Sequence, residues 1–313
     1  MNTTVKSRLL AASAAFSLLA LSACGQEAGA SAAAAGETVT IEHAQGSTAV
    51  PVNPETVYSF DLGVLDSLDA LGLEADGVPE AVFPESLSKY EDGKYTKIGS
   101  MKEPDFEAIS AGAPDLIIIS GRTAGAYEEL SKIAPTIDLS IDQARALESF
   151  TGQAENLGRI FEAEDLVSEK LAAIDAQIEE TRAKAADAGK GLILLTSGGE
   201  VTAYGAGSRF GLVHDVLGVP TAAEVKADGA HGESVSFEFV KETNPDLLFV
   251  VDRDAAMGTE GEAAAAVLDN DLVKSTNAVR NGRIVPLDAT SWYNVGYGLN
   301  NLPAMVGDVE AAL

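Results

Sequence analysis

Three arginines stand at positions where a guanidinium group could bind an anion. Arg122 follows the apolar run Leu116–Ile119, and Arg253 follows the apolar run of residues 247–251. Arg209 lies in a glycine-rich turn at residues 205–211. Arginine stays charged when it is desolvated and donates several hydrogen bonds, so it suits a multiply charged ligand. The alternative for each arginine is a surface cation that pairs with one of the chain's many carboxylates.

Motifs of common catalytic sites are missing from the chain. The glycines of residues 205–211 have the spacing Gly-x-Gly-x-x-x-Gly, which differs from the dinucleotide fingerprint Gly-x-Gly-x-x-Gly, and we find no opening strand followed by a ribose-binding acid. There is no Gly-x-Ser-x-Gly elbow, no phosphate-loop Gly-Lys-Ser/Thr and no His-Glu-x-x-His. The sequence therefore favours a binding protein over an enzyme.

The chain is strongly acidic, with a formal net charge of −27. Such a charge disfavours nucleic acid and an anionic membrane surface as partners, because both repel it. A site for an anionic ligand would therefore need a local cluster of positive charge on this otherwise acidic chain.

A spacing pattern occurs twice in the chain. Each copy has Phe-Glu, then six residues, Pro-Asp-Leu, then five residues and an arginine. The two copies run from Phe106 to Arg122 and from Phe237 to Arg253. In each, a helix is expected to begin after an N-cap, Asp105 or Ser236, to end at the proline, and to lead into a buried strand. We interpret the two halves as one fold used twice.

Strand and helix patterns alternate along both halves, which indicates parallel sheets flanked by helices. The expected strands are residues 57–60, 116–119, 192–195, 247–251 and 284–287. Residues 144–188 lack proline, and Leu166, Leu171, Ile174 and Ile178 recur there at helical spacing. They predict one long helix between the halves. Ligands bind beyond the carboxyl ends of strands in such sheets, so Arg122 and Arg253 should face a crevice between two lobes.

Secretion is indicated by the beginning of the sequence. Lys6 and Arg8 precede an apolar run at residues 9–21, and Leu-Ser-Ala-Cys follows, ending at Cys24. This element resembles a bacterial lipobox, so we predict cleavage before Cys24 and its lipidation. The alternative is an ordinary signal peptide with an incidental cysteine. As the only cysteine, Cys24 can form no intramolecular disulfide.

The domain organisation follows from these patterns. We expect a signal peptide at residues 1–23, and then the lipidated cysteine with a flexible tether, poor in large apolar residues, at 24–37. An N-terminal α/β lobe should occupy 38–143, the linking helix 144–188 and a C-terminal α/β lobe 189–313. The expected fold class is α/β, with two Rossmann-like lobes joined by a single long helix and the ligand cleft between them.

Taken together and in order, eight segments resemble the siderophore-binding lipoproteins of bacterial ABC importers, specifically the catecholate binders of the petrobactin and enterobactin type. The segments are residues 53–57, 60–63, 102–107, 114–122, 204–218, 231–232, 250–253 and 292–293. This class III family of substrate-binding proteins has two α/β lobes bridged by a long helix, so the resemblance implies the same fold as the patterns above.

The resemblance also implies roles for individual residues. Arg122, Arg209 and Arg253 would neutralise a ferric catecholate. His231 and Tyr293 would ligate iron directly where the siderophore offers too few donors, since iron(III) favours oxygen and accepts imidazole. Without the resemblance, His231 reads as a solvated loop residue and Tyr293 as aromatic packing at the rim of a cleft.

Two acids would have a role outside the cleft. The family places carboxylates at the positions of Glu107 and Glu238, on the outer tips of the lobes, to dock on permease arginines. The alternative is that each acid stabilises the first turn of its helix.

The function implied is capture of a ferric catecholate siderophore outside the cytoplasm and delivery to an ABC importer. The protein would be a monomer, lipid-anchored to the outer face of the cell membrane or periplasmic, with no cofactor besides its iron-bearing ligand and no nucleic-acid partner. Alternatives are a binder of ferric citrate or hydroxamate chelates, a binder of haem or cobalamin, and an extracellular metal-dependent enzyme that would use His231.

Overall fold

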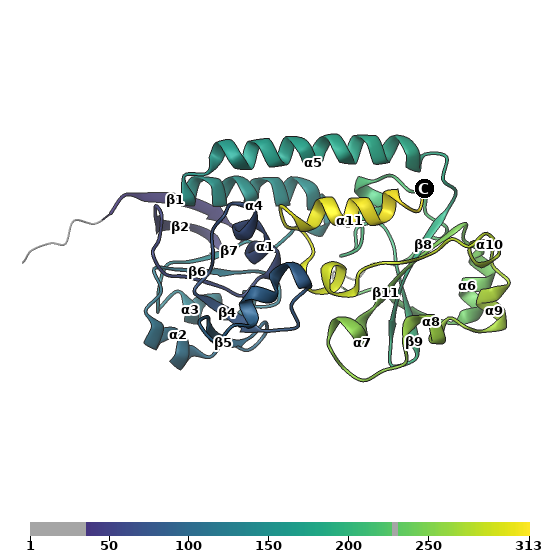
Figure 1. The fold of residues 1–313 in the computed structure, drawn as a ribbon, viewed down its shortest axis with the longest axis horizontal. Coiled ribbons are helices and arrows are strands. Elements are labelled where there is room, and N and C mark those ends of the chain that lie inside the picture. Colours follow the sequence, from purple (N-terminus) through teal and green to yellow (C-terminus); the bar gives the residue numbers. More distant parts are fainter. Residues whose placement is uncertain (1–35, 227–230) are drawn as a thin grey trace, which may run out of the picture. The chain divides into compact units, whose positions relative to one another are not determined.

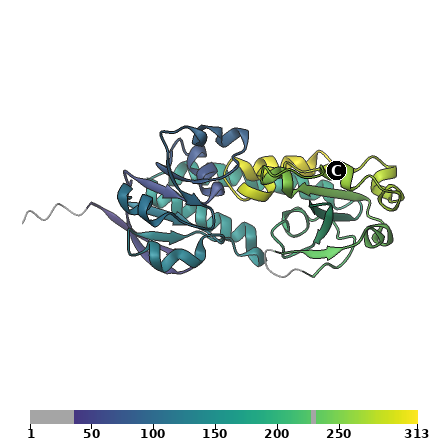
Figure 2. The same ribbon diagram turned by 90° about the horizontal axis from the view of Figure 1, so that it is seen from below.

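A computed structural model describes residues 36–226 and 231–313, in which two five-stranded sheets form two lobes (Figures 1 and 2). The predicted signal segment and Cys24 lie outside the described residues. Within the two described ranges, no helix is long and apolar enough to cross a membrane.

All strands of the first lobe's sheet are parallel, in the order β5-β4-β3-β6-β7. Its strands are β3 (Val57–Ser59), β4 (Gly77–Glu80), β5 (Thr96–Ser100), β6 (Leu116–Ile119) and β7 (Thr136–Asp138). An antiparallel hairpin, β1 (Thr38–His43) and β2 (Gly46–Pro51), precedes them. The helices are α1 (Leu62–Ala70), α2 (Phe106–Gly112) and α3 (Tyr127–Leu130), with 3₁₀ turns η1 (Glu85–Glu91), η2 (Ala124–Ala126) and η3 (Gln143–Arg145).

Side chains of β6, an inner strand of this sheet, alternate between two apolar cores. Leu116 and Ile118 pack with α1 residues such as Leu65, whereas Ile117 and Ile119 pack on the opposite face. All four β6 residues are buried because helices cover both faces of a parallel sheet.

The second lobe has a mixed sheet in the order β10-β9-β8-β11-β12. Its strands are β8 (Gly191–Ser197), β9 (Glu200–Tyr204), β10 (Glu233–Val235), β11 (Leu247–Asp252) and β12 (Ile284–Pro286). β8, β11 and β12 are parallel, but β9 and β10 run antiparallel to their neighbours. Gly198 and Gly199 make the turn between β8 and β9 with φ of +57° and +81°. A two-residue turn with positive φ at both positions closes a hairpin, so this half departs from the parallel pattern we predicted.

Short helices surround the second sheet. They are α6 (Phe237–Thr243), α7 (Arg253–Ala256), α8 (Ala264–Val267), α9 (Asp271–Lys274) and α10 (Asn277–Arg280), with the π-helical turns η4 (Leu212–Val216) and η5 (Ser291–Val295) and the last helix, α11 (Asn301–Glu310).

The repeated sequence pattern forms the same structure in both lobes. Asp105 caps α2 by accepting from Glu107 N and Ala108 N, and Ser236 caps α6 by accepting from Phe239 N. Each helix ends at a left-handed residue before the proline, and each following strand, β6 or β11, is fourth in its sheet order. The N-caps and buried strands predicted for both copies are confirmed.

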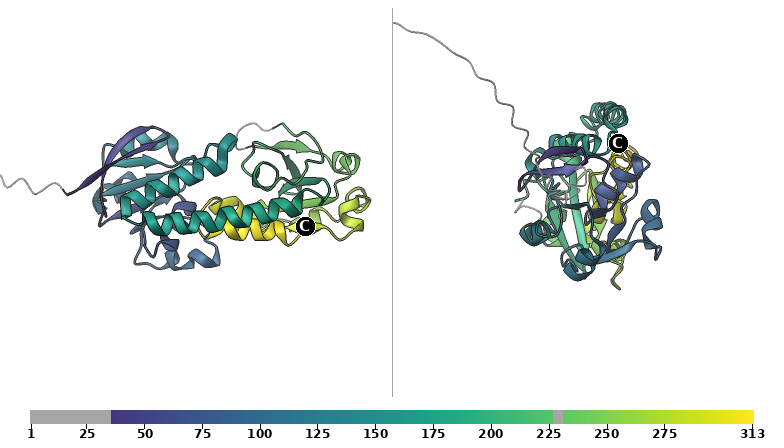
Figure 3. Two further views of the ribbon diagram at one scale, coloured as in Figure 1. Left: turned by 90° about the horizontal axis from the view of Figure 1, so that it is seen from above. Right: turned by 90° about the vertical axis from the view of Figure 1, so that its left-hand side faces the viewer.

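The prediction of one helix over residues 144–188 is wrong, because the structure has two. α4 (Ala146–Phe161) ends at Glu162, which has a φ of +50°, and α5 (Glu164–Ala185) folds back along it and extends from the first lobe to the second (Figures 1 and 3). A side chain at Gly158 would come within 3.2 Å of Glu164 Cα, so glycine permits the close turn. The buried residues at the end of α4 and the start of α5 keep nearly the same helical spacing across the turn at Glu162. The spacing of apolar residues in the sequence therefore did not reveal that the helix is interrupted.

Residues after β12 return to the first lobe. The buried Asp66 of α1 accepts hydrogen bonds from Asn300 N at 2.8 Å and Asn301 N at 2.9 Å, where α11 begins. Burial raises the pKa of Asp66, against the effect of these two hydrogen bonds. Gly63 packs directly on this segment, since an added Cβ would lie 2.2 Å from Tyr297 O. The C-terminal segment is therefore a second connection between the lobes, besides α5.

Candidate functional site

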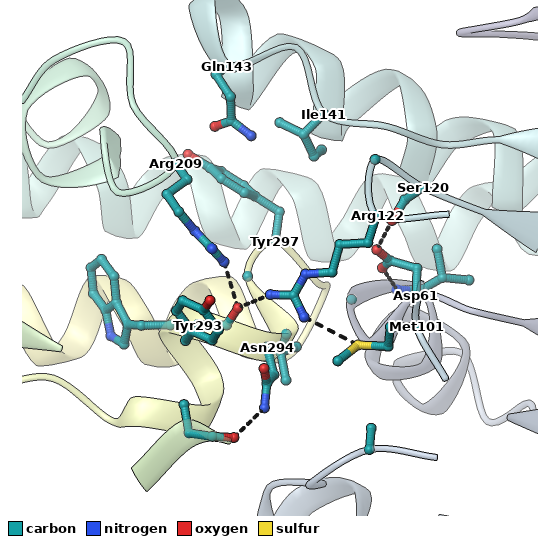
Figure 4. A pocket seen from close by; sticks show the side chains of 18 of the residues that line it. Asp61, Met101, Ser120, Arg122, Ile141, Gln143, Arg209, Tyr293, Asn294 and Tyr297 are labelled. Carbon is teal, nitrogen blue, oxygen red and sulfur yellow. Dashed lines mark hydrogen bonds between the residues drawn. The ribbon is translucent and has the colours of Figure 1, made fainter. Parts of the chain in front are cut away.

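A cavity of about 1200 Å³ has both lobes in its lining. The first lobe contributes residues that follow strands β3 and β6, including Asp61 and Arg122. From the second lobe come Arg209 and, directly after β11, Arg253. Tyr293 of η5 lies among them (Figure 4). The crevice thus lies beyond the carboxyl ends of strands in both sheets, where α/β proteins bind ligands.

All three arginines converge on Tyr293. Its carbonyl oxygen accepts from Arg122 Nη2 and from Arg209 Nη2, each at 2.6 Å (Figure 4). Its hydroxyl oxygen accepts from Arg253 Nε at 3.0 Å. The guanidinium carbons lie 5.3, 4.3 and 5.8 Å from the ring centroid for Arg122, Arg209 and Arg253, within the range of cation–π attraction.

Neighbouring side chains hold two of the arginines in place. Arg122 Nη1 lies 3.3 Å from Met101 Sδ, and Thr123 Oγ1 donates to Met101 O at 2.7 Å. Arg253 begins α7 and donates from Nη1 to Ser197 Oγ at 3.1 Å. Met101 and Ser197 therefore help to hold Arg122 and Arg253 in the orientations in which they donate to Tyr293.

Arg209 is positioned by its glycine-rich turn. Gly207 has a φ of +70°, a conformation that favours glycine, and the buried Ser208 donates to Gly205 O at 2.6 Å. The guanidinium lies 5.1 Å from the Phe210 ring as well as over Tyr293. The turn therefore fixes the position of Arg209 in the cavity, which explains its glycines without a nucleotide site.

The described part of the chain offers this cationic cluster no carboxylate as an ion-pair partner. Among the residues that the structure describes, no ion pair includes Arg122, Arg209 or Arg253. Burial lowers the pKa of Arg209, and the charge of Arg122 lowers it further. Three half-buried cations that repel one another, in a chain of net charge −27, form a site that an anion would stabilise.

Asp61 also lines the cavity, but it is occupied by other contacts. It caps α1 by accepting from Val64 N at 2.8 Å and accepts from the Ser120 hydroxyl (Figure 4). Burial raises the pKa of Asp61, although the charge of Arg122 acts in the opposite direction. The carboxyl group is therefore poorly suited to cancel the charge of the arginines.

The electrostatic environment favours ionisation of Tyr293. Burial opposes ionisation of the phenol, but the hydrogen bond from Arg253 and the charges of the three arginines outweigh it, so the pKa of Tyr293 is lowered. A phenol that ionises readily is a suitable oxygen ligand for a hard cation such as iron(III).

His231 is exposed and lines the same cavity, next to residues 227–230, which are outside the described part of the chain. In the described part, no group of three or more His, Cys, Asp or Glu residues could hold a metal ion by itself.

Glu107 and Glu238 are not in the lining of the cavity and belong to helices α2 and α6, which lie in different lobes (Figure 1). Both side chains are exposed. Hydrogen bonds from its own backbone N–H and from Ser236 lower the pKa of Glu238. The acids are accessible, and both also occupy the first turn of a helix, where a negative charge is favourable.

Several cavity residues were not predicted from the sequence. Met101 and Ser197 support the arginines, whereas Gln143 and Asn294 place amide groups in the cavity. Only Asn294 had a signal in the sequence, its position next to Tyr293; the others come from segments without a motif.

Comparisons with known proteins agree with the two-lobed α/β fold. A model of the family described as periplasmic binding protein matches residues 57–290. The petrobactin-binding protein YclQ of Bacillus subtilis is 44% identical over 94% of each chain, and its crystal structure superposes with a TM-score of 0.85, covering 88% of this chain and 98% of that one. The ferric-anguibactin-binding protein FatB of Vibrio anguillarum is 33% identical, over 87% of this chain and 86% of that protein.

A further solved structure is that of the periplasmic catecholate-siderophore binding protein VctP from Vibrio cholerae. It superposes with a TM-score of 0.83 at 39% identity, covering 88% of this chain and all of that one.

Proposed function

Because the chain belongs to the periplasmic binding protein family, we propose that it captures a ferric siderophore of the catecholate type outside the cytoplasm and delivers it to an ABC importer. The observation that carries this proposal is the convergence on Tyr293 of three arginines that form no ion pair within residues 36–226 and 231–313. Catecholate oxygens around iron(III) leave a multiply charged anion, which such a cluster complements.

Binding would exchange one set of acceptors for another. Arg122 and Arg209 now donate to the Tyr293 carbonyl, and Arg253 to its hydroxyl. Siderophore oxygens would accept hydrogen bonds from these N–H groups in place of Tyr293. The negative charge of the siderophore would relieve the repulsion among the arginines. Where the chelator leaves coordination positions open, the Tyr293 phenolate would occupy one and His231 another. No covalent bond is made or broken in this function.

The ligand class can be tested by titrating the purified protein while recording the fluorescence of Trp292, the only tryptophan, which adjoins Tyr293. We expect saturable quenching by ferric bis-catechol and tris-catechol complexes. The bis-catechol complex should gain a shifted charge-transfer band, which Tyr293→Phe abolishes because it removes the phenolate ligand. The tris-catechol complex, whose iron is saturated, should bind Tyr293→Phe with an unshifted spectrum.

Other outcomes would identify other ligands. Saturation by ferric citrate, a ferric hydroxamate or haem, with no response to either catecholate, would replace the proposed ligand class.

The proposal includes attachment of the protein to the outer face of the membrane through lipidated Cys24. The acidic surface does not favour electrostatic attachment to anionic lipid, so a covalent lipid is the means that fits this chain.

Delivery would use Glu107 and Glu238 as contacts for permease arginines. Replacing both by alanine is expected to leave siderophore affinity unchanged and to reduce uptake of iron-55 siderophore by cells about tenfold or more, since two charge-assisted contacts are lost. Glu155 and Glu169, exposed acids on α4 and α5, provide a matched control pair. Uptake by the E107A/E238A protein equal to that by E155A/E169A would contradict docking through these acids.

A further inference from the structure

Asn294 lines the ligand cavity and contacts both lobes. Its side chain is 9% exposed. Nδ2 donates to Ala256 O of α7 at 2.7 Å and, at a longer 3.4 Å, to Val82 O, which follows β4 in the first lobe. Because both neighbours are carbonyl acceptors, only the NH₂ end of the amide can face them, which fixes the orientation of the group.

This orientation turns the amide oxygen of Asn294 to the other side. Within residues 36–226 and 231–313, four buried side-chain atoms lack a hydrogen-bond partner: Gln143 Oε1, Thr181 Oγ1, Thr196 Oγ1 and Asn294 Oδ1. Asn294 and Gln143 line the ligand cavity, whereas the two threonines do not. Two of the four unpaired atoms therefore belong to one site.

Gln143 comes from a different part of the fold. It lies in η3, between β7 and α4 of the first lobe. In Figure 4, Gln143 and Asn294 lie on opposite sides of the group formed by Arg209 and Tyr293. The cationic centre of the cavity thus has an amide acceptor on either side.

An unpaired buried acceptor is costly unless a partner arrives with the ligand. The arginines donate to Tyr293, Met101 and Ser197 in this structure, and to neither of the two amide oxygens. In a ferric catecholate, the catechol oxygens are deprotonated on iron, so the donors that remain are N–H groups of the linker between the catechols.

We propose that Asn294 Oδ1 and Gln143 Oε1 accept hydrogen bonds from amide N–H groups of the ligand's linker, so that the cavity selects chelates by their linker as well as by their anionic iron centre. The inference rests on the proposed function of this cavity and adds a second basis for specificity. The arginines recognise charge, which many chelates share, while the two amide oxygens recognise donors that only some have.

The test compares two ferric bis-catechol complexes of equal charge. One chelator has secondary amides in its linker, away from the catechol oxygens, and the other has the same amides N-methylated. We expect the wild-type protein to bind the N–H complex about tenfold more tightly, because methylation removes the donors and leaves the acceptors unpaired. Asn294→Leu and Gln143→Leu should each reduce this preference, and the double variant should abolish it.

The measurements separate this inference from the proposed function. Binding of neither complex by the wild type would overturn the proposed function itself. Tight binding of both complexes with equal affinity, or a preference that persists in the double variant, would overturn the acceptor role and leave siderophore binding intact. Gln143 makes no side-chain hydrogen bond within the described residues, so Gln143→Leu tests the inference even if Asn294→Leu disturbs contact between the lobes.

Discussion

Replacement of Arg209 by methionine is expected to weaken binding of a ferric catecholate by about 100-fold, with a smaller loss for Arg122→Met or Arg253→Met. Arg209 lies nearest the Tyr293 ring, at 4.3 Å, and has no carboxylate partner among the described residues. Its charge is therefore available to the ligand. Methionine keeps most of the length and apolar contact of the side chain, so the loss measures charge and hydrogen bonding.

The size of this effect follows from the type of contact. A hydrogen bond to a charged group contributes about 1.5–3 kcal/mol, and about 1.4 kcal/mol corresponds to a tenfold change in affinity. Lysine at position 209 should recover only part of the loss, since an ammonium group lacks the planar arrangement of donors. Isothermal titration of each variant with one ferric bis-catechol complex gives the comparison.

Arg145→Met is the matched control for Arg209→Met. Arg145 is an exposed arginine that forms ion pairs with Asp142 and Glu148. Its side chain does not line the cavity. Its replacement should leave the dissociation constant unchanged. If all three cavity arginines can be replaced together without loss of affinity, the arginine cluster has no part in binding and the proposed ligand is wrong.

Gly63→Ala is expected to lower the free energy of unfolding by about 3 kcal/mol, because the new methyl group would overlap backbone that cannot easily move. The added Cβ would lie 2.2 Å from Tyr297 O and 3.0 Å from Val295 O. These oxygens belong to the C-terminal segment that packs on α1 and leads to the Asp66 contacts. The variant should therefore also disturb how Tyr293 is presented to the cavity.

Gly152→Ala provides the matched control in a helix. Apart from the neighbouring backbone of its own helix, no atom lies within 4 Å of a Cβ at Gly152, in the middle of α4, so alanine should stabilise the protein by about 0.5–1 kcal/mol. Denaturant unfolding followed by circular dichroism measures both variants. Equal stability of the two alanine variants would mean that the segment at Tyr297 moves freely, contrary to the tight packing described above.

The local features of this fold could be read directly from the sequence. The strands at 116–119 and 247–251 are continuous apolar runs because helices cover both faces of their sheets. The N-caps Asp105 and Ser236 and the prolines after α2 and α6 act within a few residues of themselves, so their spacing alone predicted both helices. Because Arg122 and Arg253 follow these apolar runs directly or within a few residues, both could be assigned to strand ends.

Contacts between distant segments were decided only by the tertiary structure. The turn at Glu162 depends on α4 packing against α5, and the apolar spacing continues through it nearly unchanged. The pair Gly198 and Gly199 could have indicated the β8–β9 hairpin from the sequence. No feature of the sequence indicated that β10 pairs with β9.

The site shows the same division. Strand position indicated Arg122 and Arg253, a glycine-rich turn indicated Arg209, and the residue type indicated an anionic ligand, whereas the class of that ligand came from the family resemblance. Their meeting at a single tyrosine, and the unpaired amide oxygens of Gln143 and Asn294, arise from segments up to 171 residues apart in sequence. Such contacts depend on the packing of whole elements against one another, and a local pattern contains no record of that packing.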